Sequence, residues 1–208
     1  MKKLRYTRIV VPVFLALAVV FVAAAGAAPS PKKMVLTRLD LSSAFLPDGA
    51  TPVPNAAVVA SGAATDAQLA TWGRIDGYKA TFKIKSNRAL ANKLTGPIYI
   101  ISSANTYSAA TGAHAAWLVQ LSSLKKTAGI HTAKARRIGS ESKLFTYTQS
   151  AKVQGVTVTY MIYIYTWRSV SNTATVTCEG IKGRITKQAV IKLALKQQSR
   201  INAAYAAG

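Results

Sequence analysis

Cysteine, histidine and acidic residues are all scarce in this chain of 208 residues. It contains one cysteine, two histidines and six Asp+Glu residues. The single cysteine, Cys178, excludes an intramolecular disulfide, so packing has to stabilise the fold. His114 and His131 are isolated, and neither belongs to an H-x-x-x-H or H-x-x-E pattern. We therefore expect no metal site and no cofactor.

The few carboxylates do not form the pattern of an active site. None stands three or four residues from another, and no G-x-S-x-G, G-x-x-x-x-G-K-[ST] or G-x-G-x-x-G motif is present. Ser140 beside Glu141 is better interpreted as a turn, because no histidine is placed to act as its base. We predict no catalytic residues. The alternative is a small hydrolase in which two carboxylates, or one carboxylate with His114 or His131, meet in the folded chain.

Basic residues, in contrast, are abundant. The chain has 27 Lys+Arg against 6 Asp+Glu, a net charge of +21 at pH 7. A charge of this size attracts polyanions. The candidate binding residues are the basic side chains of short clusters and of the C-terminal helix: Lys125, Lys126, Arg136, Arg137, Lys187, Lys192, Lys196 and Arg200.

The first 27 residues have the pattern of an export signal. Four basic residues precede an apolar run over 9–25, and the run ends in Ala25-Gly26-Ala27, small residues that a signal peptidase accepts. We predict cleavage near Ala27 and a secreted or extracytoplasmic protein, while an uncleaved membrane anchor is the alternative. Without those four bases, 23 Lys+Arg remain against 6 Asp+Glu, a net charge of +17.

Export restricts the partners that such a basic protein could meet. We expect an anionic wall polymer, an anionic lipid surface or another extracytoplasmic protein. Tyrosines on a basic sheet could stack on bases, but most of them are simpler to explain as core. We therefore do not predict specific nucleic-acid binding.

Composition divides the remaining chain into two parts. Residues 28–64 are rich in Pro, Gly and Ala, and we predict a mobile leader followed by a surface loop. Residues 65–208 are predicted to form a single domain. The run Thr65-Asp66-Ala67-Gln68 fits a capping box that opens a short helix, and Gly73 is expected to end it.

Periodicity within 65–208 predicts an α+β fold. Alternating apolar and polar residues predict strands at about 73–86, 97–107, 130–138, 142–150, 154–168 and 171–179, and helical spacing predicts helices at about 109–126 and 183–205. The strand at 154–168 is apolar or aromatic on both faces, which is typical of a central, covered strand. We expect an antiparallel sheet of about five to six strands with two long helices packed on it. An apolar cavity between the layers would instead indicate a small-molecule carrier.

A series of short motifs carries a family resemblance. WGRIDGYKATF, TGAHAAWL, RRIGSES and TWRSVSNTATVTCEG precede a basic helix that ends in Q-x-x-R-I. Over roughly 65–205 they resemble uncharacterised secreted or lipid-anchored bacterial proteins, whose fold is similar to the extrinsic photosystem II subunits and the Ran-release-factor proteins. The resemblance implies a sheet sandwiched by helices and a binding or assembly role. This chain departs from it at Ser140, where relatives often carry an acid, and in lacking a lipid-acceptor cysteine.

Overall fold

The computed structural model describes residues 28–85, 95–153 and 155–207, so the predicted export signal at 1–27 lies outside the described residues. Its strands pair antiparallel in one seven-stranded sheet, in the order β1-β2-β3-β7-β6-β5-β4. The strands are β1 (Phe45–Pro52), β2 (Arg74–Ile84), β3 (Tyr99–Tyr107), β4 (His131–Ala133), β5 (Glu141–Val153), β6 (Val156–Ser169) and β7 (Asn172–Ile181).

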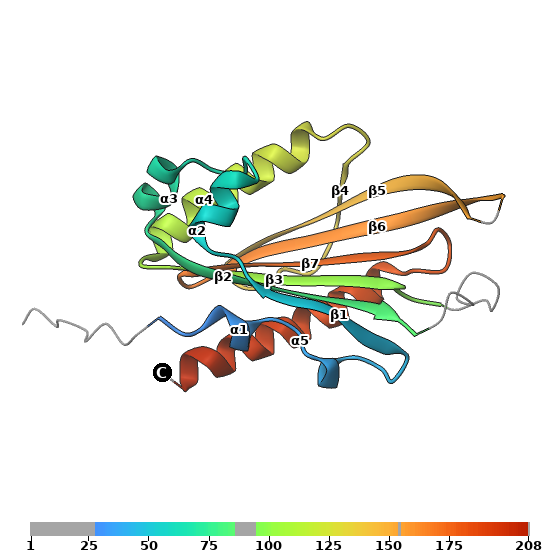
Figure 1. The fold of residues 1–208 in the computed structure, drawn as a ribbon, viewed down its shortest axis with the longest axis horizontal. Coiled ribbons are helices and arrows are strands. Elements are labelled where there is room, and N and C mark those ends of the chain that lie inside the picture. The colour runs from blue at the N-terminus through green and yellow to red at the C-terminus, as the bar shows by residue number, and fades with distance from the viewer. Residues whose placement is uncertain (1–27, 86–94, 154, 208) are drawn as a thin grey trace, which may run out of the picture.

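Helices pack on both faces of this sheet, with a different set of helices on each face. The helices are α1 (Pro31–Met34), α2 (Asn55–Ala60), α3 (Asp66–Trp72), α4 (Ala110–Lys126) and α5 (Lys187–Ala206), with a 3₁₀ turn, η1, at Arg38–Asp40. Figure 1 shows α2, α3 and α4 on one face, and α1 and α5 on the other. The predicted α+β class, with two long helices on an antiparallel sheet, is confirmed. Among the described helices, none is long and apolar enough to cross a bilayer.

Alternation along the strands divides the core between the two helical layers. In β6, Tyr165 and Trp167 are fully buried in the cluster that includes the inner face of α5. Their neighbour Ile164 packs in a second cluster, with Trp117 and Leu121 of α4. Successive side chains of a strand point to opposite faces, so one strand supplies both layers.

The predicted short helix has the expected caps. Thr65 Oγ1 accepts from Gln68 N–H at 3.2 Å, and Thr65 N–H donates to Gln68 Oε1 at 2.9 Å. Gly73 ends the helix with a φ of 60°, a left-handed conformation that glycine adopts at little cost.

The prediction of a mobile leader and surface loop over 28–64 was wrong. Met34, Val35 and Leu36 are buried in the main core, and the sequence 45–52 forms β1. β1 escaped detection because only Phe45 is buried along it, which leaves no alternating pattern. Its prolines are tolerated because β1 is an edge strand, paired only with β2. This strand brings the sheet to seven strands instead of five to six.

Two further strand predictions need correction. β6 lies inside the sheet as predicted, between β7 and β5, but it is buried only toward its C-terminal half and is not covered along its whole length. The start of β6 pairs with the end of β5 in a long, largely exposed hairpin. The strand predicted at 130–138 ends at Ala133, because the Arg136 carbonyl and the Ile138 N–H bond to the side chains of Tyr165 and Ser142 instead of to a strand.

Candidate functional site

Three of the predicted basic residues meet in space with a fourth that the sequence analysis missed. Arg136, Lys187 and Lys192 line a groove of about 510 Å³ together with Lys134. The groove lies between the irregular segment 134–136 and the first turns of α5. We call it the basic groove; its full lining is Lys134, Ala135, Arg136, Lys187, Gln188, Ile191, Lys192 and Leu195.

The wall formed by segment 134–136 is held by its backbone carbonyls. Lys187 Nζ donates to the Lys134 carbonyl at 2.9 Å, and the Tyr165 hydroxyl donates to the Arg136 carbonyl. Lys134 is two residues from Arg136 and follows β4 in a segment without regular secondary structure, where both residues line the basic groove. Its closeness in sequence to the predicted Arg136 was a signal that could have identified Lys134.

The positive charge of the basic groove is not balanced by acidic residues. No acidic side chain lines it, and in the described part of the chain none of its basic residues forms an ion pair. The first turn of α5 contains no acid either, and Thr186 caps it through Ala189 N–H at 3.3 Å. The positive end of the helix dipole therefore adds to the charge of Lys187 and Lys192.

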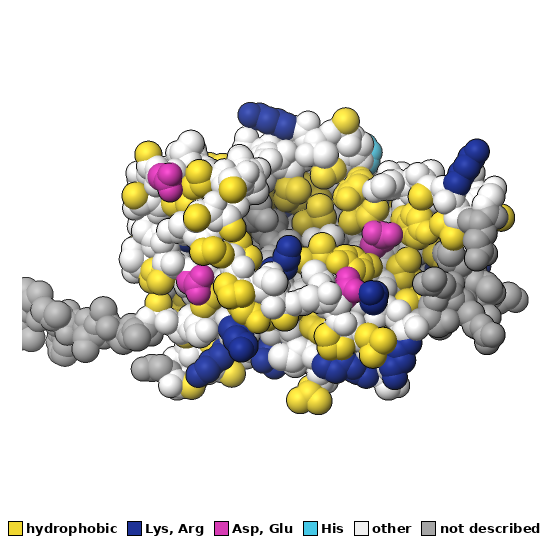
Figure 2. Space-filling model, in the orientation of Figure 1, with side chains coloured by type: hydrophobic (Ala, Val, Ile, Leu, Met, Phe, Trp, Pro, Cys, Tyr) yellow, Lys and Arg dark blue, Asp and Glu magenta, His cyan; other side chains and the backbone are white. Residues whose placement is uncertain are grey.

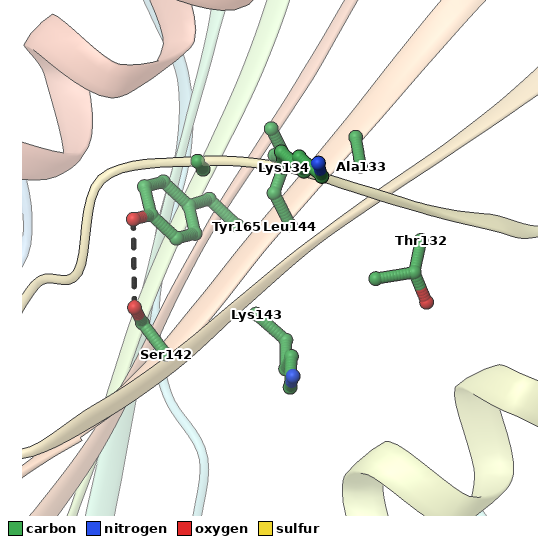
Figure 3. Close-up of a pocket in the computed structure, with 8 residues that line it drawn as sticks. Thr132, Ala133, Lys134, Ser142, Lys143, Leu144 and Tyr165 are labelled. Carbon is green, nitrogen blue, oxygen red and sulfur yellow. Dashed lines mark hydrogen bonds between the residues drawn. The ribbon is translucent and has the colours of Figure 1, made fainter.

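A smaller cavity of about 390 Å³ adjoins the basic groove and shares Lys134 and Ala135 with it. Figure 3 shows Ser142 and Tyr165 facing each other beneath the segment that carries Lys134, with their hydroxyls 3.5 Å apart. Lys143 of β5 also lines this cavity. The positive lining therefore continues from α5 toward β5.

The other predicted basic residues lie elsewhere. Lys125 and Lys126 are exposed in the last turn of α4, in the opposite helical layer. Arg137 Nη2 donates to the Ser140 carbonyl. Lys196 Nζ donates to the Asp40 carbonyl at 2.5 Å, and Arg200 Nη1 is 3.4 Å from Asp40 Oδ2. These last three side chains therefore bond to groups outside the basic groove and do not line it.

A second, larger cavity lies on the other side of the sheet. The sequence analysis named such a cavity as an alternative but predicted none of the residues that line it. It measures about 660 Å³ and lies between the α2–α4 layer and the sheet; we call it the helix–sheet cavity. Figure 2 shows a hollow in the middle of the side of the molecule that faces the viewer, with hydrophobic side chains around it. Its most buried charged residue is Arg74 at the start of β2, which is 7% exposed.

One histidine and one carboxylate do meet. His114 Nδ1 and Arg168 Nε are each 2.8 Å from Glu141 Oε2, and these two neighbours lower the pKa of Glu141. No hydroxyl or thiol hydrogen-bonds to His114 in the described part of the chain. The arrangement is therefore that of a surface ion-pair cluster. Over the same ranges, no three His, Cys, Asp or Glu side chains group in a way that could hold a metal ion.

Comparison with known proteins supports the fold. No protein-family model matches the chain, and no curated protein matches it. The structure is similar to the crystal structure of the extracellular domain of PknH from Mycobacterium tuberculosis, with a TM-score of 0.57 and 15% sequence identity. The match covers 86% of this chain and 100% of that chain.

At that identity the similarity concerns the fold alone. It supports the layered α+β architecture that the motifs implied, and it assigns the chain to no family. The resemblance to the extrinsic photosystem II subunits and the Ran-release-factor proteins stays a prediction.

Proposed function

We propose that this protein is an extracytoplasmic binding protein whose basic groove holds a segment of an anionic polymer. The observation that carries the proposal is the convergence of Lys134, Arg136, Lys187 and Lys192 on one groove without an acidic residue. Like charges held together repel one another, and a bound polyanion relieves that repulsion.

The shape of the site favours a polymer over a flat surface. Its cations come from two walls, the segment 134–136 and the start of α5, so a chain of anionic groups can lie between them. A planar lipid surface would contact only the outermost side chains. An extracytoplasmic location is part of the proposal, supported by the export-signal pattern at 1–27 and by the similarity to an extracellular domain.

Retention on a heparin column tests this function, because heparin is an anionic polymer. The test variant is the double substitution Lys187→Ala and Lys192→Ala. The matched control is Lys125→Ala with Lys126→Ala, which removes the same charge from the last turn of α4. Lys187→Ala loses the bond to the Lys134 carbonyl but also removes a cation from the positive end of a helix dipole, so we expect the test variant to fold.

The wild type and the control should elute at similar salt concentrations, and the groove variant at a clearly lower one. Screening by salt weakens exposed charge pairs, so elution position reports the electrostatic contact. If the two double variants elute at the same salt concentration, the proposal that the basic groove binds the polymer is refuted. Binding of the wild type to anionic vesicles but not to heparin would point instead to a lipid surface.

A further inference from the structure

The helix–sheet cavity has the dimensions and lining of a small-molecule site. Its volume of about 660 Å³ lies in the range of about 300–1,000 Å³ that is usual for ligand pockets. Apolar side chains from α2, α3 and α4 form one wall, among them Val58, Leu69 and Val119. The strands supply the polar floor.

The floor of the cavity is internally hydrogen-bonded. Thr173 Oγ1 accepts from Asn105 Nδ2 at 3.3 Å and is 3.4 Å from the Tyr107 hydroxyl. From the helical wall, Gln120 Nε2 of α4 donates to Thr175 Oγ1 on the floor at 3.1 Å. Because these groups already bond to one another, the floor is a preformed surface and its side chains are held in place.

The charge of the cavity has one sign. Arg74 and Lys79 line it, and no Asp, Glu or His does. The Arg74 guanidinium donates to three neutral acceptors, Asn55 Oδ1 at 2.5 Å, the Val53 carbonyl at 2.6 Å and Asn105 Oδ1 at 2.8 Å.

No ion pair involves Arg74 within the described ranges. The Asp76 carboxylate is near enough to act electrostatically on the Arg74 guanidinium, but it forms no ion pair with it and accepts from the Gly77 N–H at 2.7 Å. A buried guanidinium that forms no direct ion pair is costly, and an anionic group supplied by a ligand would offset that cost.

We propose that the helix–sheet cavity binds a small ligand with an apolar body and one anionic group, and that Arg74 contacts the anionic group. The apolar wall formed by α2, α3 and α4 takes the body of the ligand, and Lys79 adds a second positive charge at the cavity. This site is independent of the basic groove, which lies in the other helical layer against α5.

Arg74 also has a structural role that the test has to separate from binding. Its bonds to Asn55 and to the Val53 carbonyl tie the start of α2 to β2. A purely structural arginine would support the binding of neutral and anionic ligands equally. A recognition residue would matter only for the anionic one.

Two fluorescent probes of nearly the same shape make this separation. N-phenyl-1-naphthylamine is neutral, and 8-anilinonaphthalene-1-sulfonate is the same skeleton with a sulfonate. We expect the wild type to bind the sulfonate about tenfold more tightly than the neutral probe, since a charge-assisted hydrogen bond to a buried guanidinium strengthens binding by about that factor. Trp72 lines the cavity, so its fluorescence gives a second readout.

Two variants decide the outcome. Arg74→Gln should lose most of the preference for the sulfonate while it still binds the neutral probe. Ser103→Phe, which places a ring on the cavity floor, should weaken both probes about tenfold or more. The control Lys125→Ala with Lys126→Ala should bind both probes like the wild type, and the heparin test changes no residue of the cavity, so the two proposed sites are tested separately.

An unchanged preference in Arg74→Gln, or unchanged binding of both probes in Ser103→Phe, would overturn the proposal. If Arg74→Gln does not fold, Lys79→Gln takes its place, because Lys79 is exposed and its side chain forms no hydrogen bond or ion pair with the residues that the structure describes. We then expect a smaller but measurable loss of preference for the sulfonate, and no loss would overturn the assignment of an anionic ligand.

Discussion

Glu141 and Arg168 face each other across the ladder between β5 and β6, and Arg168 Nε lies 2.8 Å from Glu141 Oε2. The bond to Arg168 is the main cause of the lowered pKa of Glu141, and His114 Nδ1 adds a second contact on the same oxygen. The cluster ties the first half of α4 to the start of β5.

Acid should weaken this cluster. The folded state holds the pKa of Glu141 below its ordinary value of 4.5, so its stabilising contribution is complete above about pH 4.5 and is lost as the pH falls through the folded pKa. We therefore expect the Tm of the wild type to fall more steeply than that of Glu141→Gln between about pH 5 and pH 3. Parallel curves of Tm against pH would contradict this.

Glu179 provides a control of opposite sign. Burial raises its pKa above 4.5, so ionising it costs stability as the pH rises through that region. Glu179→Gln should gain stability relative to the wild type as the pH increases from about 4 to 7. A pH response of both variants in the same direction would show that the individual environments of Glu141 and Glu179 do not control the effect.

Ser102 joins three parts of the chain that are far apart in sequence. Its Oγ accepts from Leu36 N–H at 2.9 Å and donates to Gln197 Oε1 at 2.7 Å, and all of these groups are buried. Ser102→Ala leaves both partners without a bond, and we expect a loss of about 1–3 kcal/mol in the free energy of unfolding. Urea denaturation measures it.

The adjacent Ser103 is a matched control for Ser102. It lines the helix–sheet cavity, and no hydrogen bond of its hydroxyl is found within the described residues. Ser103→Ala should therefore change the free energy of unfolding by less than about 0.5 kcal/mol. A loss of equal size in both variants would indicate that the network around Ser102 is not what stabilises this region.

Gly112 permits the close approach of α4 to the end of α3. A Cβ at this position would lie 1.8 Å from the carbonyl oxygen of Trp72, a backbone atom that cannot rotate away. We expect Gly112→Ala to lower the Tm and to weaken binding of the neutral probe, because Trp72 lines the helix–sheet cavity. Thermal unfolding and probe titration measure the two effects.

Gly129→Ala is the comparison for Gly112→Ala. Gly129 has a φ of 76° and open space around its Cβ direction, so an alanine there meets only the backbone cost of about 1–2 kcal/mol. It should lower the Tm without changing probe binding. Equal probe affinity in the Gly112→Ala variant and the wild type would disprove the role of this contact in shaping the cavity.

Cys178 should be chemically silent in the folded protein. It is fully buried in β7, and burial raises the pKa of its thiol far above the usual value. The thiolate is the reactive form, so a thiol reagent such as 5,5′-dithiobis(2-nitrobenzoate) should label Cys178 only in denaturant. Rapid stoichiometric labelling of the native protein would refute this.

Local patterns predicted the elements of this fold well. The capping box at Thr65, the alternation in 142–150 and the helical spacing in 109–126 depend on neighbours within a few residues, and each is found near its predicted place. β1 was missed because an edge strand buried at one position has no periodic signal. The burial of Met34 was missed for a similar reason, since the segment around it is short and its partners lie on α5 and β3.

The candidate sites were predicted only in part. The basic character of the chain pointed to a polyanion site, but the eight predicted residues divide among several places on the surface. Lys134 and Lys187 are 53 residues apart and meet because the Lys134 carbonyl accepts from Lys187 Nζ. A carrier cavity was one of the alternatives, but the sequence did not single out Arg74, because Arg74 lies at the start of an ordinary alternating strand and its burial beside the cavity depends on distant segments.

The sequence by itself determined the charge of this protein, its lack of disulfides and the order of its main strands and helices, because these follow from composition and from contacts close along the chain. The tertiary structure decided which basic residues lie together without an acidic residue, and where a cavity forms between the helices and the sheet. Both depend on packing between segments that are distant in sequence, and that packing leaves no local pattern from which it could be predicted.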